Sequence, residues 1–184
     1  MRLVDWLTSQ PDVDAGRIGM IGFSKGGMDL YLAAAADPRI AAAVPCIGVR
    51  SFRWAIENNA WQLRVGTFQA AVDAAAREDA GGGPMDGAFL KRFYDRVAPG
   101  VYGEFDGPQM LPLIAPRPLL VINGDSDPRT PMDGLRECLG AAERAYRDAG
   151  AADRYRVLIE ANTGHKVNPD AMDAAMQWFS QRLG

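Results

Sequence analysis

Short apolar runs alternate with longer stretches of helical periodicity along most of the chain. The apolar runs cover residues 17–21, 40–49, 118–122 and 155–159. The run at 40–49 is apolar on both faces, which is typical of a buried parallel strand. Strands that alternate with helices indicate an α/β fold. We therefore expect a three-layer structure, with a mainly parallel sheet of about four strands and flanking helices.

Apolar residues three and four positions apart predict the helices. Leu3 and Leu7 belong to such a pattern near the start of the chain, and residues 25–36 form an Ala-rich stretch after the first strand. Thr130-Pro131 and Asn168-Pro169 each have the form of an N-cap followed by a proline at the first helical position. These last two helices should flank the sheet.

Residues 51–115 form a helical insertion between the second and third predicted strands. Trp54 and Trp61 are seven positions apart and are expected to share a helix face. Residues 80–84, with the sequence Ala-Gly-Gly-Gly-Pro, predict a flexible break in the insertion. The aromatic side chains of this segment either line an acyl pocket as a lid, or pack the insertion onto the sheet, or take the place of segments that would otherwise cover it. Further amphipathic stretches contain Phe68 with Val72, and Phe89 with Phe93 and Val97.

Composition excludes several classes of function. The 184 residues are 48% hydrophobic and 23% charged, which is ordinary for one globular domain. A net charge of −3 and a pI near 5.2 argue against nucleic-acid or anionic-membrane partners. No apolar run is long enough for a membrane span, and an early Asp5 does not fit a signal peptide. We expect a cytoplasmic protein.

Metal and cofactor sites are not expected. The single histidine and two distant cysteines, Cys46 and Cys138, have no structural-zinc spacing. The glycines do not form a nucleotide-binding motif. The two cysteines are expected to be buried and free.

The candidate nucleophile is Ser24, in the segment Gly22-Phe23-Ser24-Lys25-Gly26-Gly27. A G-x-S-x-G turn between a strand and a helix is the plan of a nucleophile elbow. Gly22 and Gly26 are expected to allow the close approach of strand and helix that a Cβ would block. The backbone N–H of Lys25 would then point at a developing oxyanion. The alternative is that Ser24 is an ordinary helix N-cap.

The other catalytic groups follow later strands. His165, the only histidine, is the one available imidazole base and stands just after the run 155–159. An acidic loop at 124–128, containing Asp125 and Asp127, follows the run 118–122. The order serine, acid, histidine is that of an α/β-hydrolase. The alternative to a catalytic role is that Asp127 only forms a turn and that His165 is a surface-loop residue.

From Pro11 to the C-terminus the chain resembles the catalytic half of an α/β-hydrolase, closest to the dienelactone hydrolase and prolyl-oligopeptidase-like esterases. The resemblance is carried by residues 11–14, 22–27, 124–131 and 164–165. It implies that Asp127 is the triad acid, with Asp125 as the alternative, and that small carboxylic esters are the substrates. Phe23, Trp54 and Trp61 are the candidate substrate-binding residues.

Members of this family have several strands and an oxyanion loop before the elbow strand, so we expect this chain to be the C-terminal half of the fold. The elbow strand, with Ile18, Met20 and Ile21, would then be an apolar sheet edge. We expect a homodimer or higher oligomer that buries this edge and the first helix. The alternative function is that of a non-catalytic half-domain, which binds a partner chain through the same edge.

Overall fold

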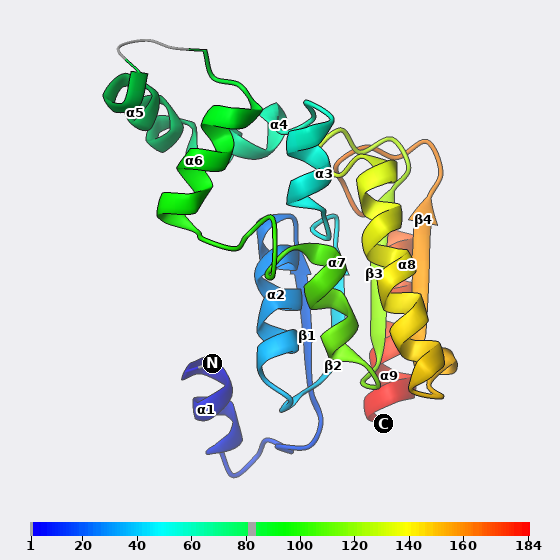
Figure 1. The fold of residues 1–184 in the computed structure, drawn as a ribbon. Helices are drawn as coiled ribbons and strands as arrows, with labels where there is room; N and C mark the ends of the chain where they lie inside the picture. The colour runs from blue at the N-terminus through cyan, green and yellow to red at the C-terminus, as the bar shows by residue number, and fades with distance from the viewer. Residues whose placement is uncertain (1, 81–83) are drawn as a thin grey trace.

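The computed structural model describes residues 2–80 and 84–184. In this described part, four parallel strands form one sheet in the order β1-β2-β3-β4 (Figure 1). The predicted α/β class and the parallel sheet are confirmed. The centre of the predicted break, residues 81–83, lies outside the described residues. The strands are β1 Ile18–Phe23, β2 Ile40–Cys46, β3 Leu119–Gly124 and β4 Tyr155–Glu160.

Helices cover both faces of the sheet, giving the expected three layers (Figure 1). The apolar run of β3 is continuous because its side chains are buried on both faces of the sheet. Leu119 and Val121 join the core under α2 and α8, whereas Leu120 and Ile122 join the core under α9. Each residue of this central strand is therefore buried. The flanking helices are α1 Arg2–Thr8, α2 Lys25–Ala36, α7 Gly107–Met110, α8 Met132–Asp148 and α9 Pro169–Leu183, with the 3₁₀ turns η2 Leu111–Ile114 and η3 Ala152–Arg154.

The insertion between β2 and β3 has a hydrophobic core of its own, which includes Phe52, Val72 and Phe93. Trp54 and Trp61 do not share a helix, so that prediction is wrong. Asn59 has φ 51°, a left-handed conformation that asparagine tolerates, and it separates the two tryptophans. The elements of the insertion before α7 are α3 Phe52–Glu57, α4 Gln62–Val65, η1 Gly66–Phe68, α5 Gln69–Ala80 and α6 Gly87–Val97.

Several element boundaries differ from the expected ones. β2 ends at Cys46 rather than continuing to residue 49, because Ile47 has φ 46° and leaves the strand conformation. α8 begins at Met132, and Thr130 is not its cap, because the Thr130 hydroxyl bonds within the acidic loop. α9 does begin at Pro169 after Asn168, as predicted. Cys46 and Cys138 are free and buried, also as predicted.

Helix α2 packs unusually close to the first two strands, at a glycine the sequence pattern did not single out. A Cβ on Gly27 would lie 2.7 Å from the Cys46 carbonyl oxygen and 2.9 Å from that of Gly22. Gly26, which we expected to permit this approach, has open space around it. The helix–strand contact therefore depends on Gly27, and the Gly26 expectation is corrected.

Alanine substitutions at these two neighbouring glycines should have opposite effects. Gly27→Ala forces backbone to move and should lower the free energy of unfolding by about 1–3 kcal/mol. Gly26→Ala fills open space in a helix and should raise it by about 0.5–1 kcal/mol. Urea denaturation of both variants checks this, and equal effects at the two positions would contradict the packing argument.

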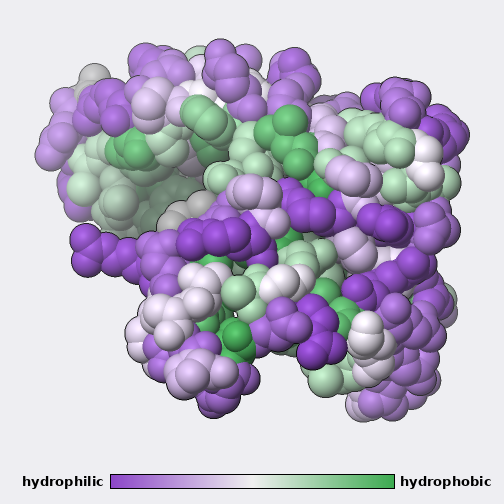
Figure 2. Space-filling model, turned by 90° about the horizontal axis from the view of Figure 1, so that it is seen from below, coloured by the Kyte–Doolittle hydropathy of each residue, from purple (hydrophilic) through white to green (hydrophobic). Residues whose placement is uncertain are grey.

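Strand β1 lies at one edge of the sheet and the short helix α1 lies near it (Figure 1). Two large apolar side chains of α1, Leu3 and Trp6, are 64% and 58% exposed. Seen from below, hydrophobic side chains reach the surface in patches between hydrophilic ones (Figure 2). Within residues 2–80 and 84–184, no helix has both the length and the apolar character needed to cross a bilayer.

We expect a second copy of the chain to cover the β1 edge and α1. The double variant Leu3→Glu/Trp6→Glu places charges on exposed positions, so it should turn the proposed oligomer into a monomer while leaving thermal stability nearly unchanged. Leu63→Glu, at a similarly exposed apolar position in α4, is the matched control. Light scattering at micromolar concentration measures the mass, and a monomeric unsubstituted chain would refute this expectation.

Candidate active site

Ser24 lies at the tight turn between β1 and α2. Its backbone has φ 53° and ψ −117°, in the positive-φ region that residues with a Cβ seldom adopt. The turn is held by a 2.9 Å hydrogen bond, which the Ser24 N–H donates to the Cys46 carbonyl. The Ser24 hydroxyl makes no capping bond to α2. The ordinary N-cap interpretation therefore does not describe this residue.

Close backbone contacts hold this turn in its strained conformation. A Cβ on Gly22 would lie 2.3 Å from the Gly26 carbonyl oxygen, and one on Gly48 would lie 2.4 Å from the Ser24 carbonyl oxygen. Both distances are shorter than carbon and oxygen can approach. Gly48, in the segment after β2, and the first turn of α2 thus contact the elbow from two sides. These contacts keep Ser24 in its conformation.

His165 lies between Ser24 and Asp127. Its Nε2 is 2.8 Å from the Ser24 Oγ, and its Nδ1 is 2.8 Å from the Asp127 Oδ2. A carboxylate only accepts hydrogen bonds, so Nδ1 carries the proton in this pair and Nε2 of the neutral ring is free to accept from the serine hydroxyl. The Asp127 side chain is fully buried and that of His165 is 19% exposed.

Asp127, and not Asp125, is the aspartate that reaches His165. Its Oδ1 accepts a 2.8 Å bond from the backbone N–H of Arg129, and its Oδ2 also accepts from the Thr130 hydroxyl. Asp125 is exposed and accepts bonds from the Ser126 hydroxyl at 2.8 Å and the Thr163 N–H at 3.2 Å. The Ser126 hydroxyl is the main cause that lowers the pKa of Asp125. Asp125 thus links the acidic loop to the loop between β4 and α9, which carries His165.

The parallel sheet explains why residues so far apart in sequence meet. Ser24, Asp127 and His165 follow β1, β3 and β4, and the carboxyl ends of parallel strands share one edge of a sheet. The acidic and histidine loops are in close contact, because a Cβ on Gly124 would lie 2.0 Å from the Thr163 carbonyl oxygen.

A small cavity of about 70 Å³ opens beside the Ser24 side chain. It combines aromatic and aliphatic residues with three basic ones, and its wall contains no acidic residue. Its lining residues are Ser24, Lys25, Met28, Arg50, Phe52, Thr67, Phe68 and Arg129.

The predicted substrate-binding residues are not in this lining. Trp54 packs against Gly134 of α8, where a Cβ would meet its ring at 2.8 Å. Trp61 is buried in the insertion's own core, and Phe23 is an exposed residue at the end of β1. Lys25 does lie beside the cavity; as the first residue of α2 its backbone N–H has no intrahelical acceptor. Its ammonium group pairs with Asp29 at 2.6 Å.

Sequence reasoning missed Thr130 and Arg50. The sequence pattern predicts Thr130 as a helix cap, although its position three residues after Asp127 also suits a hydroxyl that orients the carboxylate. Arg50 comes four residues after β2, at the edge of the sheet where ligands bind in open α/β folds. A search of that edge for charged residues would have found it.

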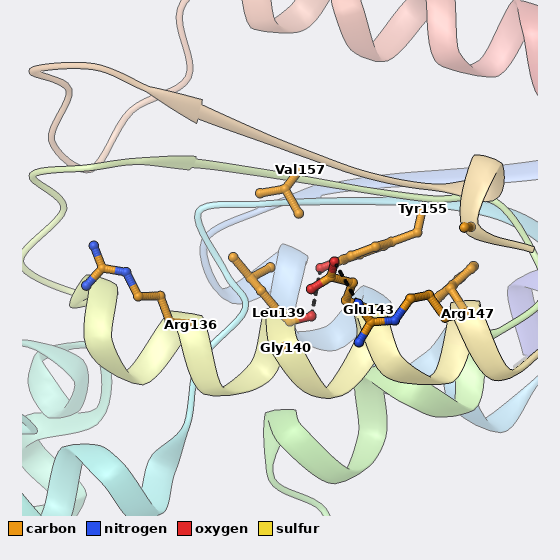
Figure 3. A pocket seen from close by; sticks show the side chains of 9 residues that line it. Arg136, Leu139, Gly140, Glu143, Arg147, Tyr155 and Val157 are labelled. Carbon is orange, nitrogen blue, oxygen red and sulfur yellow. Dashed lines mark hydrogen bonds and ion pairs between the residues drawn. The ribbon is translucent and has the colours of Figure 1, made fainter.

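A larger cavity, of about 550 Å³, lies between α8 and β4 (Figure 3). Its floor is apolar, with Leu139, Tyr155 and Val157, and the Glu143–Arg147 ion pair lies at its side. It contains no nucleophile and shares no lining residue with the cavity at Ser24. We therefore place the candidate chemistry at the smaller cavity.

The part of the chain that the structure describes does not gather three or more His, Cys, Asp or Glu side chains into a group that could hold a metal ion. The polar groups at or beside the cavity include the Ser24 hydroxyl, the His165 imidazole, the Asp127 carboxylate and the basic side chains of the lining.

Comparisons with known proteins agree with this fold. The chain is 30% identical to a putative hydrolase, YtaP, of Bacillus subtilis over 162 residues, which are 88% of this chain and 44% of that protein. It is 29% identical to 4-O-methyl-glucuronoyl methylesterase 1 of Sodiomyces alcalophilus over 84% of this chain and 30% of that one. The chain thus spans less than half the length of these curated relatives.

A solved structure shares the fold at low sequence identity. The glucuronoyl esterase from Solibacter usitatus superposes on all of this chain and on 46% of its own, with a TM-score of 0.67 and 22% identity. The family described as X-Pro dipeptidyl-peptidase (S15 family) matches residues 1–101, which is more than half of the 184 residues. The chain has the architecture of α/β-hydrolase esterases and belongs to the X-Pro dipeptidyl-peptidase (S15) family.

Proposed function

We propose that this chain hydrolyses small carboxylic esters through a serine nucleophile. The observation that carries the proposal is the continuous row of hydrogen bonds from Ser24 through His165 to Asp127, on an elbow with positive φ. A serine hydroxyl is a weak nucleophile until an adjacent base takes its proton, and a third group must hold that base in the right tautomer. All three requirements have a candidate residue here.

In the first half of the reaction, the Ser24 Oγ attacks the ester carbonyl carbon while the His165 Nε2 takes the hydroxyl proton. The negative charge on the former carbonyl oxygen faces the backbone N–H of Lys25 at the start of α2, where the helix dipole favours an anion. The imidazolium then gives its proton to the leaving alkoxide, which departs as the alcohol. An acyl-serine ester remains.

In the second half, water replaces the alcohol. The neutral His165 accepts a proton from the water as its oxygen attacks the acyl-serine, and the imidazolium returns that proton to the Ser24 Oγ as the carboxylic acid leaves. Throughout, Asp127 keeps the proton on Nδ1 and stabilises the imidazolium. Thr130 and the Arg129 N–H hold the carboxylate in position for this role.

Ester substrates are supported by the names of two relatives, the glucuronoyl methylesterase and the glucuronoyl esterase, whereas the description of the family itself, X-Pro dipeptidyl-peptidase, names a peptidase. The alternative remains a non-catalytic half-domain that binds a partner through the β1 edge. A chemical probe of the nucleophile separates the two functions.

A fluorophosphonate should form one covalent adduct with the purified chain, located on Ser24 by peptide mapping. Ser24→Ala should remove both the adduct and ester turnover, and should leave the melting temperature unchanged because the hydroxyl makes no structural bond to α2. Intact-mass spectrometry with an ester panel measures this. A folded chain that forms no adduct would favour the non-catalytic half-domain.

The two aspartates of the acidic loop should respond differently to amide substitution. Asp127→Asn keeps the shape but lets the wrong imidazole tautomer form, so kcat should fall by about 10⁴-fold. Asp125→Asn is the matched control and should keep kcat close to that of the unsubstituted chain, with a loss of stability because the Thr163 bond weakens. Steady-state kinetics and thermal unfolding check both variants, and a larger loss of kcat in Asp125→Asn would reverse the assignment.

A further inference from the structure

Arg50 is a buried arginine at the Ser24 cavity without a carboxylate partner. It is only 8% exposed, and it lines the cavity together with Ser24. Its Nε donates a 3.3 Å bond to the Gly48 carbonyl oxygen. Within residues 2–80 and 84–184, it forms no ion pair. Buried charges in proteins are normally paired, so this guanidinium is an exception that calls for a ligand.

A second buried arginine makes the local excess of positive charge larger. Arg64 is 4% exposed, and it donates bonds to the Ser51 carbonyl at 2.6 Å and to the Arg129 carbonyl at 3.0 Å. Its buried Nη2 has no partner among the described residues. Burial, followed by the positive charge of Arg50, lowers the pKa of Arg64 to about 10. The two guanidinium groups therefore repel each other in a poorly solvated region.

Nearby carboxylates are already used by other groups. Asp106 is fully buried, but its oxygens accept bonds from the Ser51 hydroxyl and from the backbone N–H groups of residues 52, 53 and 107. Asp127 accepts from Arg129, Thr130 and His165. Neither forms an ion pair with Arg50, although the field of Asp127 does favour its charged form.

The wall of the Ser24 cavity also has an excess of positively charged side chains. Lys25, Arg50 and Arg129 line it, together with the apolar side chains of Met28, Phe52 and Phe68. Lys25 and Arg129 are exposed, and Lys25 also pairs with Asp29, so the desolvated cation of the cavity is Arg50. A small cavity with a nucleophile, an apolar wall and one buried guanidinium suits a short acyl chain that ends in an anion.

We propose that Arg50 recognises an ionised carboxylate on the acyl part of the substrate, so that the favoured substrates are monoesters of short dicarboxylic acids. This inference rests on the proposed esterase function, and names the substrate class of the same site. The planar guanidinium can donate two parallel bonds to a carboxylate, and the low-dielectric surroundings strengthen this pairing. Arg50 would thus supply specificity, while Ser24 and His165 carry out the chemistry.

The test compares two esters that differ in one charge. Monoethyl succinate carries the free carboxylate, and diethyl succinate carries a neutral ester at the same position; ethanol release from each is followed by NMR. The unsubstituted chain should prefer the monoester in kcat/KM. In Arg50→Met this preference should fall by about ten- to hundredfold, mainly through KM of the monoester, because a charge-assisted bidentate pair is lost.

Two control variants accompany the test. Arg50→Lys keeps the charge without the planar pair of donors and should retain part of the preference. Arg92→Met removes a positive charge from the exposed face of α6, away from the cavity, and should leave both rates unchanged. Melting temperatures of all variants report on folding. Loss of a buried guanidinium that has no ion-pair partner should not lower them greatly.

Succinate binding separates the failure of this inference from the failure of the proposed function. Succinate should raise the melting temperature of the unsubstituted chain and not that of Arg50→Met, whether or not either ester is hydrolysed. An inactive chain with that shift would support the anion site and refute the esterase function. Equal losses of both ester activities in Arg50→Met would overturn the inference and assign Arg50 to the oxyanion or the fold. An active chain with no preference for the monoester and no succinate shift would also overturn it.

Discussion

The close approach of α2 to strands β1 and β2 is the constraint on which the candidate site depends. Gly22, Gly27 and Gly48 leave no room for a Cβ at the points where helix, strand and the segment after β2 meet. This packing holds Ser24 at φ 53°, a conformation that costs roughly 1–3 kcal/mol and persists only where its surroundings enforce it. The close packing of α2 on β1 and β2 therefore both stabilises this side of the sheet and holds the Ser24 hydroxyl in place.

Much of this arrangement follows from local patterns in the sequence. The apolar runs predict the strands of the parallel sheet. The G-x-S-x-G turn and the Ala-rich stretch after it predict the elbow and the helix over residues 25–36. The parallel strands place Ser24 and His165 at the same end of the sheet. Because β1 and β4 are its two outer strands, the contact between the two residues also depends on the path of the loop after β4, which the strand order does not reveal.

What could not be predicted depends on contacts between distant segments. The choice of Gly27 over Gly26 is set by where the Cys46 carbonyl lies, which no spacing in the helix reveals. The turn at Asn59 separates two tryptophans that a heptad spacing would place on one face. Thr130 has the pattern of a helix cap, yet its hydroxyl bonds to Asp127 and Asn123 instead of to the start of α8. Cavity walls are the least predictable feature, because separate stretches of the chain contribute to one small volume. Its lining residues are Ser24, Lys25, Met28, Arg50, Phe52, Thr67, Phe68 and Arg129.

The insertion is also connected, through Arg64, to the segment that follows Asp127. Its guanidinium reaches from α4 to the Arg129 carbonyl in the acidic loop and to the Ser51 carbonyl just before α3. The backbone N–H of the same Arg129 donates to Asp127. One buried side chain thus fixes the spacing between the segment that carries Phe52 and the loop that carries the acid. An acyl group bound against Arg50 and Phe52, as we propose, would lie beside the proposed Ser24–His165–Asp127 triad. Because the same segment holds Asp127, the position of the substrate would then be coupled to the orientation of His165.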